Sequence, residues 1–132
     1  MINKMKKLLF IILTILSTSV YAEWTFISKN TLANEYYINL EEIRKIDGYT
    51  NFWLLNNYPQ NDEYGDLSSS MYVKGDCKNY RMKFNQMIFY PEEMGNGKVN
   101  NVLNIENDPE NTWLYPPSDS PFGIAMNIAC KQ

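Results

Sequence analysis

Apolar and polar side chains alternate along much of the middle of the chain, with the period of two that is typical of half-buried β-strands. The alternation is clearest over residues 80–90, where Met82 and Phe84 lie on one face of the predicted strand and Arg81 and Lys83 lie on the other. The pattern therefore predicts a strand with an apolar face and a basic face.

Other parts of the chain also have the composition of strands. Asp47-Gly48 is a strong turn signal, and Gly75-Asp76 is expected to end the strand that precedes it. Residues 100–117 are rich in Asn and Pro and contain one aromatic segment, 113–115. Four further segments are rich in aromatic and β-branched residues and are predicted to be strands: 24–27, 35–38, 49–58 and 68–74.

The end of the chain changes to a helical period. Ser120 is a good N-cap, Pro121 suits the first helical position, and Cys130 falls on or near the last turn. The sequence thus predicts an α+β fold, in which an antiparallel sheet of five or six strands carries this C-terminal helix on one face. The apolar residues that recur at helical spacing are Phe122, Ile124, Ala125, Ile128 and Ala129.

The first residues have the pattern of a secretory signal peptide. Three lysines precede an apolar run at residues 8–16, and Val20 and Ala22 occupy the −3 and −1 positions before Glu23. A transmembrane anchor is the alternative, but the run is shorter than the ~20 apolar residues that a span needs. We expect residues 1–22 to be removed and residues 23–132 to form one domain. No cysteine directly follows the apolar run, so no lipid anchor is predicted.

The predicted mature domain is acidic. It keeps nine of the 12 basic residues and all 15 acidic residues of the chain, for a net charge of −6. An acidic surface repels nucleic acid and anionic lipid, so a nucleic-acid partner is not expected. No membrane span is predicted in this part of the chain.

The side chain that acts most often in acid–base catalysis, histidine, is missing. The chain has no histidine, which excludes Ser-His and Cys-His systems and the commonest zinc ligand. Glu41-Glu42 and Glu92-Glu93 are sequence neighbours typical of a solvated surface, although a carboxylate hydrolase stays a third alternative. Residues 61–66 lack the ligand spacing of a calcium loop. We predict no enzyme activity, catalytic residue, metal or cofactor.

Two cysteines, Cys77 and Cys130, both lie in the predicted exported domain. Cysteines in an oxidising compartment usually pair, and one disulfide would close the fold. Two free thiols or an intermolecular bridge are the alternatives. Neither cysteine belongs to a C-x-x-C motif, so redox catalysis is not expected.

A basic stripe stands out against the acidic domain. Four of the nine mature basic residues fall within ten positions, and Tyr80 lies among them with its amphipathic ring. Such a stripe could bind an acidic protein segment or a sulfated polysaccharide. The alternative is an ordinary solvated strand face on which lysines protect an edge. The predicted partner-binding residues are Lys74, Lys78, Tyr80, Arg81 and Lys83.

Three short motifs, in this order, resemble the bacterial surface-adhesin protein E family. They are residues 35–39 (Glu-Tyr-Tyr-Ile-Asn) with Ile43 after them, residues 77–81 (Cys-Lys-Asn-Tyr-Arg) and residues 94–97 (Met-Gly-Asn-Gly). A C-terminal helix ending near the second cysteine adds to the likeness, which covers most of residues 24–130. The resemblance implies an antiparallel sheet with a C-terminal helix, a disulfide, and a homodimer formed through strands.

The resemblance also implies a function. The family's adhesin binds host proteins such as vitronectin, laminin and plasminogen through a basic region around its first cysteine, which corresponds here to Lys74, Lys78, Arg81 and Lys83. Two features differ: the family's adhesin is lipid-anchored, and the basic stretch of this chain is thinner. Fold is therefore expected to transfer better than adhesion.

These observations predict an exported, non-enzymatic interaction protein that binds extracellular-matrix or serum proteins through the strand face near Cys77. The alternative is a soluble periplasmic protein with a partner inside the envelope, or a structural role. The export signal is compatible with the periplasm, the cell surface or secretion.

Overall fold

The computed structural model describes residues 23–132. The predicted signal peptide, residues 1–22, lies outside this range. Among the described residues, no helix has the length and apolar character needed to cross a membrane.

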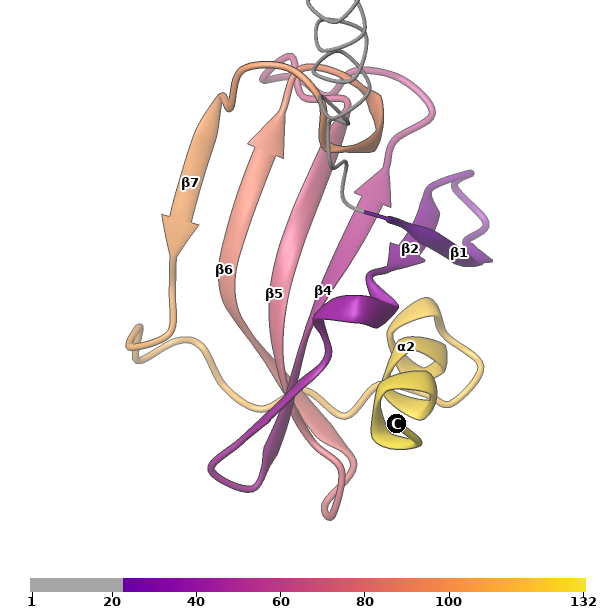
Figure 1. The fold of residues 1–132 in the computed structure, drawn as a ribbon. Coiled ribbons are helices and arrows are strands. Elements are labelled where there is room, and N and C mark those ends of the chain that lie inside the picture. Colours follow the sequence, from indigo (N-terminus) through magenta and orange to yellow (C-terminus); the bar gives the residue numbers. More distant parts are fainter. Residues whose placement is uncertain (1–22) are drawn as a thin grey trace, which may run out of the picture.

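The described chain forms a seven-stranded antiparallel sheet in the order β1-β2-β4-β5-β6-β7, with β3 paired to the lower part of β4 (Figure 1). The helix α2 lies beside the sheet at its β1–β2–β4 side. These observations confirm the predicted α+β fold, the C-terminal helix and its position. The strands are β1 (Thr25–Lys29), β2 (Glu35–Ile38), β3 (Arg44–Ile46), β4 (Tyr49–Asn57), β5 (Ser68–Asp76), β6 (Arg81–Tyr90) and β7 (Asn101–Asn104), and the helices are the 3-10 turns η1 (Leu40–Glu42) and η2 (Glu93–Gly95) and the α-helix α2 (Pro121–Cys130).

Two strands were not predicted from the sequence. β3 is three residues long and β7 has the sequence Asn-Val-Leu-Asn, and every residue in both is exposed. Neither segment has a buried face that would impose an alternating pattern, so pairing with β4 and β6 determines their structure.

The prediction that Gly75-Asp76 ends the preceding strand was wrong, because β5 continues through both residues. At Gly75, the backbone of β5 passes close to the backbone of β4 and to the core side chain of Met126. A Cβ atom there would come within 2.9 Å of the Thr50 carbonyl oxygen and 3.1 Å of Met126 Sδ. The glycine therefore permits strand and helix packing and does not interrupt the strand.

The core lies between the sheet and α2. Alternate residues of the central strands pack with the helix in one cluster, and the residues between them point to the other face of the sheet. At the side of this cluster, the ring of Phe122 contacts those of Phe84 and Tyr36 edge to face, at 5.4 and 5.6 Å between centroids. The buried cluster comprises Ile38, Phe52, Leu54, Met71, Val73 and Met82 of the strands and Ala125, Met126 and Ala129 of α2.

The start of α2 is held by a cap, as the sequence predicts. The Ser120 hydroxyl accepts a hydrogen bond from the Gly123 amide at 3.1 Å and donates one to the Pro117 carbonyl oxygen at 2.6 Å. A Cβ on Gly123 would overlap that carbonyl, so the turn into the helix needs a glycine. Tyr80 ties the same turn to the sheet, because its hydroxyl donates to the Gly123 carbonyl oxygen at 3.1 Å.

The other end of α2 is fixed by the disulfide between Cys77 and Cys130, whose Cα atoms are 5.7 Å apart. The predicted bond is thus confirmed over free thiols and an intermolecular bridge. Cys77 directly follows β5 and Cys130 is the last residue of α2, so the bond holds the helix against the end of the central hairpin.

Replacing both cysteines, as in Cys77→Ser/Cys130→Ser, tests the contribution of this bond. The cysteines are 53 residues apart. Loss of the cross-link from the unfolded chain is expected to lower the free energy of unfolding by about 4 kcal/mol. Urea unfolding followed by tryptophan fluorescence measures the change, and reduced wild-type protein should behave like the variant. An unchanged unfolding midpoint would contradict this role of the disulfide.

Candidate functional site

The strand register aligns four polar residues in one row across β3, β4, β5 and β6: Arg44, Asn51, Lys74 and Lys83 are successive Cα partners. The core residues that adjoin them in the sequence, such as Phe52 beside Asn51, point to the opposite face of the sheet. The row therefore runs across the face that turns away from α2. We call this the open face.

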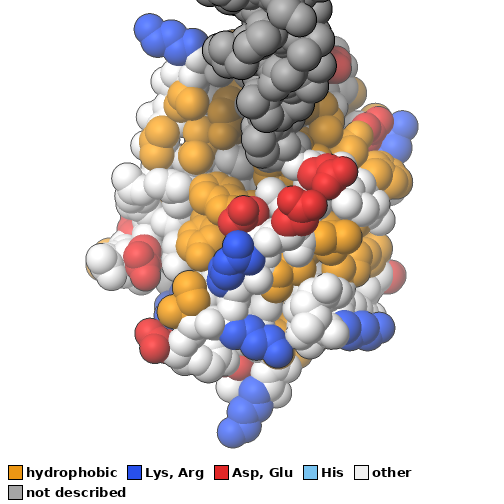
Figure 2. Space-filling view, in the orientation of Figure 1, with side chains coloured by type: hydrophobic (Ala, Val, Ile, Leu, Met, Phe, Trp, Pro, Cys, Tyr) orange, Lys and Arg blue, Asp and Glu red, His pale blue; other side chains and the backbone are white. Residues whose placement is uncertain are grey.

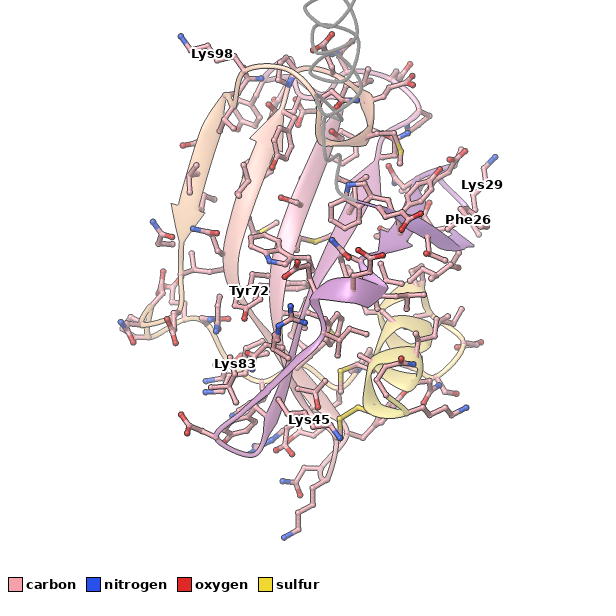
Figure 3. The ribbon with its side chains drawn as sticks, in the orientation of Figure 1. Phe26, Lys29, Lys45, Tyr72, Lys83 and Lys98 are labelled. Atoms are coloured by element: carbon pink, nitrogen blue, oxygen red, sulfur yellow. A yellow bond between two sulfur atoms is a disulfide. The ribbon has the colours of Figure 1, made fainter. Side chains whose placement is uncertain are left out.

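Two aromatic rings stack on the open face and support its cations. Tyr49 and Trp113 lie 5.8 Å apart between ring centroids, with 28° between their planes. Lys74 Nζ lies 4.2 Å from the Tyr49 centroid, while the Arg81 guanidinium and Lys83 Nζ lie 4.2 and 4.8 Å from the Trp113 centroid. We name these five residues the basic–aromatic face. Figure 3 shows Lys83 toward the lower end of the sheet, below Tyr72.

Trp113 reaches this position because its segment pairs with β6. Met82 and Leu114 form an isolated antiparallel bridge, with N–H···O distances of 2.9 and 2.8 Å between their main chains. The bridge places the Trp113 ring beside the two β6 cations that flank Met82. Sequence reasoning missed Tyr49 and Trp113 as site residues, although the aromatic segment 113–115 was a visible signal.

The cations are held close together at an electrostatic cost. Lys74 and Lys83 are direct cross-strand partners, and like charges in such positions repel each other. The electron-rich ring faces of Tyr49 and Trp113 offset part of this repulsion through cation–π attraction. The rings therefore allow three positive groups to share one small area.

Arg81 differs from the lysines because it has a carboxylate partner. Its Nε donates to Asp76 Oδ2 at 2.8 Å, and Asn79 also donates to Asp76 from its side chain at 2.9 Å. These bonds lower the pKa of Asp76 to about 2. The bond from Asn79 has the largest effect, and the bond from Arg81 has the next largest. The same ion pair raises the pKa of Arg81. In the part of the chain that the structure describes, the ion pairs are this one and Arg44–Glu42, so Lys74, Lys78 and Lys83 have no carboxylate partner there.

The structure brings together three of the five predicted binding residues and separates the other two. Lys78 is exposed in the turn between β5 and β6, at the end of the hairpin. Tyr80 packs against the core on the helix side, and its hydroxyl is bonded to Gly123. The backbone of Tyr80 is left-handed, with φ of 51°, so the residue lies in the turn before β6 begins. Tyr80 thus lies apart from the basic–aromatic face.

Comparison with known families gives one match, to the family described as Surface-adhesin protein E, over residues 24–131. The chain belongs to this family. The match includes β1 through α2 and both cysteines, so it covers the whole of the fold that positions the basic–aromatic face. Curated proteins gave no match to this chain.

Solved structures of protein E from Haemophilus influenzae share the fold. The crystal form II structure is 22% identical, with a TM-score of 0.60 over 86% of this chain and 91% of that chain. A second structure is 23% identical, with a TM-score of 0.59 over 86% and 88% of the two chains. A structure from a non-typeable strain has 22% identity and a TM-score of 0.55, and it covers 86% and 79%.

Membership of the protein E family places the chain among surface adhesins and implies a non-enzymatic role with protein partners. The similar structures support the antiparallel sheet, the helix and the overall arrangement. No group of three or more Cys, Asp or Glu residues within residues 23–132 could hold a metal ion.

The Asp76–Arg81 pair predicts a specific dependence of stability on pH. The pKa of Asp76 in the folded protein, about 2, lies below the ordinary value of 3.8, so the carboxylate stabilises the fold fully above pH ~4. This stabilisation is lost as the pH falls from about 4 to about 2. Urea unfolding should therefore show wild type more stable than Asp76→Asn at pH 5, with the difference shrinking toward pH 2. Asp119→Asn, in an exposed loop, is the matched control. A difference between wild type and Asp76→Asn that does not change with pH would contradict the assignment.

Proposed function

We propose that this chain is an exported adhesin that binds host extracellular-matrix or serum proteins through the basic–aromatic face together with Lys78. Membership of the surface-adhesin protein E family supports the type of function. The observation that carries the site is the row of lysines without carboxylate partners on the open face, next to two stacked rings.

Charge distribution favours this face as the site of attachment. The domain is acidic as a whole, so most of its surface repels acidic proteins. Lys74, Lys78 and Lys83 form a local positive area at one end of the sheet. In the view of Figure 2, basic side chains gather toward the same lower end. An acidic segment of a partner would be steered to this area and held there in one orientation.

The repulsion between Lys74 and Lys83 also favours this face as the binding site. Two lysines in direct cross-strand register lower the stability of a sheet. Opposite charges or apolar residues at these positions would stabilise the hairpin more. An arrangement that gives up stability at one place is typical of a site that serves binding.

Tyr49 and Trp113 give the face its second property, a rigid aromatic surface. Both rings are half-buried, and they support each other by stacking. Aromatic rings beside cations are the groups that most often dominate the energy of protein interfaces. Because these side chains stand on strands and on a bridged segment, they are positioned before a partner arrives.

The disulfide supports the same region. Cys77 and Lys78 are adjacent in the β5–β6 turn, so the covalent bond to α2 limits the movement of the turn. This restrains the backbone that carries Lys78, whose side chain is exposed in the turn. The proposed binding surface thus combines a rigid strand face with an anchored turn.

Paired substitutions test the site. The double variant Lys78→Ala/Lys83→Ala is expected to bind immobilised vitronectin and laminin about tenfold more weakly than wild type, because two attractive charges are lost. Lys29→Ala/Lys98→Ala removes the same charge elsewhere. Figure 3 shows Lys98 at the opposite end of the molecule from Lys83 and Lys29 at its other side.

Solid-phase binding measures both variants at two salt concentrations. The control should bind like wild type, and the loss in the site variant should be smaller at high salt, where charges are screened. Equal binding by the two variants would contradict the site. Absence of binding by wild type would contradict adhesion to these two proteins.

A further inference from the structure

A groove lies on the open face beside the basic–aromatic face. It has a volume of about 1110 Å³ and is bordered by the β3–β4 turn, by β4, β5 and β6, by Asn104 at the end of β7, and by residues 106–109 that follow. Tyr49 and Lys74 form the boundary between the two surfaces. The rest of the groove has a different chemical character from the basic–aromatic face.

The groove is lined by an amide, Asn51, whose side chain makes no hydrogen bond within the described residues. Asn51 lines the groove and is 6% exposed. Within residues 23–132, its side chain makes no hydrogen bond, and the buried side-chain atom without a partner is Asn56 Oδ1, so the polar atoms of Asn51 are not closed off from solvent. Asn51 is therefore placed to bond a group that enters the groove.

Amides are the commonest type of side chain in the lining. Gln86 Nε2 donates to Asn104 Oδ1 at 2.8 Å, which orients both side chains across the β6–β7 pair. This bond leaves the Gln86 oxygen free to accept and the Asn104 nitrogen free to donate. A hydroxyl group, which both donates and accepts, satisfies such a pair. The amides of the lining are Asn51, Asn85, Gln86, Asn104 and Asn107.

One aromatic ring gives the groove a flat apolar surface. Tyr72 lines the groove, is half-buried, and packs against Trp53 with 4.9 Å between ring centroids. It is the cross-strand partner of Gln86, so ring and amides face the same space. The negative face of an aromatic ring attracts groups with a slightly positive edge, such as the C–H groups of a sugar ring.

The charges of the groove select against anions. Asp47, Glu106 and Asp108 line it, with Lys74 as the basic member. Sulfated, phosphorylated or sialylated ligands would meet net repulsion there. The aliphatic lining is limited to Ile46 and Pro109. A protein segment would thus find only these two aliphatic side chains in the lining.

We propose that this groove binds an uncharged oligosaccharide, with Tyr72 under a sugar ring and with Asn51, Gln86 and Asn104 bonded to its hydroxyl groups. The open shape of the groove suits a short stretch of a longer glycan. The proposal is independent of adhesion through the basic–aromatic face, since its polar contacts come from other side chains.

Nuclear magnetic resonance of the isotope-labelled exported protein, isolated with its disulfide formed, tests the proposal. The neutral probes are lactose, N-acetyllactosamine, maltotetraose and chitotetraose; the charged probes are 3′-sialyllactose, a heparin hexasaccharide and a lysine-rich peptide. At least one neutral probe should shift the side-chain amide signals of Asn51, Gln86 and Asn104 in a saturable manner. No shift with any neutral probe at millimolar concentration would overturn the proposal. Shifts caused by the charged glycans alone, or by the peptide alone, would also overturn it.

Variants separate this groove from the proposed adhesive face. Gln86→Ala/Asn104→Ala should weaken binding of the responding sugar about tenfold, because two hydrogen-bonding groups are lost. Gln60→Ala/Asn96→Ala removes the same groups from exposed loops and should leave sugar binding unchanged. Lys78→Ala should also leave it unchanged, whether or not the protein binds vitronectin. Equal affinity of the groove variant and wild type would overturn the proposal.

Discussion

The bond between Cys77 and Cys130 is the constraint on which the arrangement of this domain depends. The core cluster is small, and three of its members come from α2. The helix is tied to the sheet at its start by the hydrogen bond from Tyr80 to Gly123 and at its end by the disulfide, so both ends are fixed to the sheet. With α2 confined to one face, the opposite face of β4, β5 and β6 stays open for other uses.

Strand alternation then divides the residues between packing and binding. In each central strand a core residue adjoins a residue of the open face: Phe52 adjoins Asn51, Val73 adjoins Lys74, and Met82 adjoins Lys83. The core residues hold the face rigid, while their neighbours are free to meet a partner or ligand. The basic–aromatic face and the polar groove are two parts of this one surface and differ in charge.

Sequence reasoning found the features that depend on neighbours along the chain. The alternation over residues 80–90, the cap at Ser120 and the cysteine pair predicted the sheet, the helix and the disulfide. It also found the lysines, but it did not find their aromatic support or the groove. Tyr49, Trp113 and Asn51 acquire their roles through strand register and through the Met82–Leu114 bridge, and neither is encoded in local patterns.

Hydroxyl-radical footprinting of the exported protein, alone and saturated with vitronectin, tests the binding face most directly, because oxidation reports the exposure of individual side chains. Binding through the basic–aromatic face predicts that Tyr49 and Trp113 become protected. Tyr64, which is 76% exposed in the loop at the opposite end of β4, should be oxidised at the same rate in both states. Unchanged oxidation of Trp113 together with protection of Tyr64 or Phe26 would contradict binding through this face.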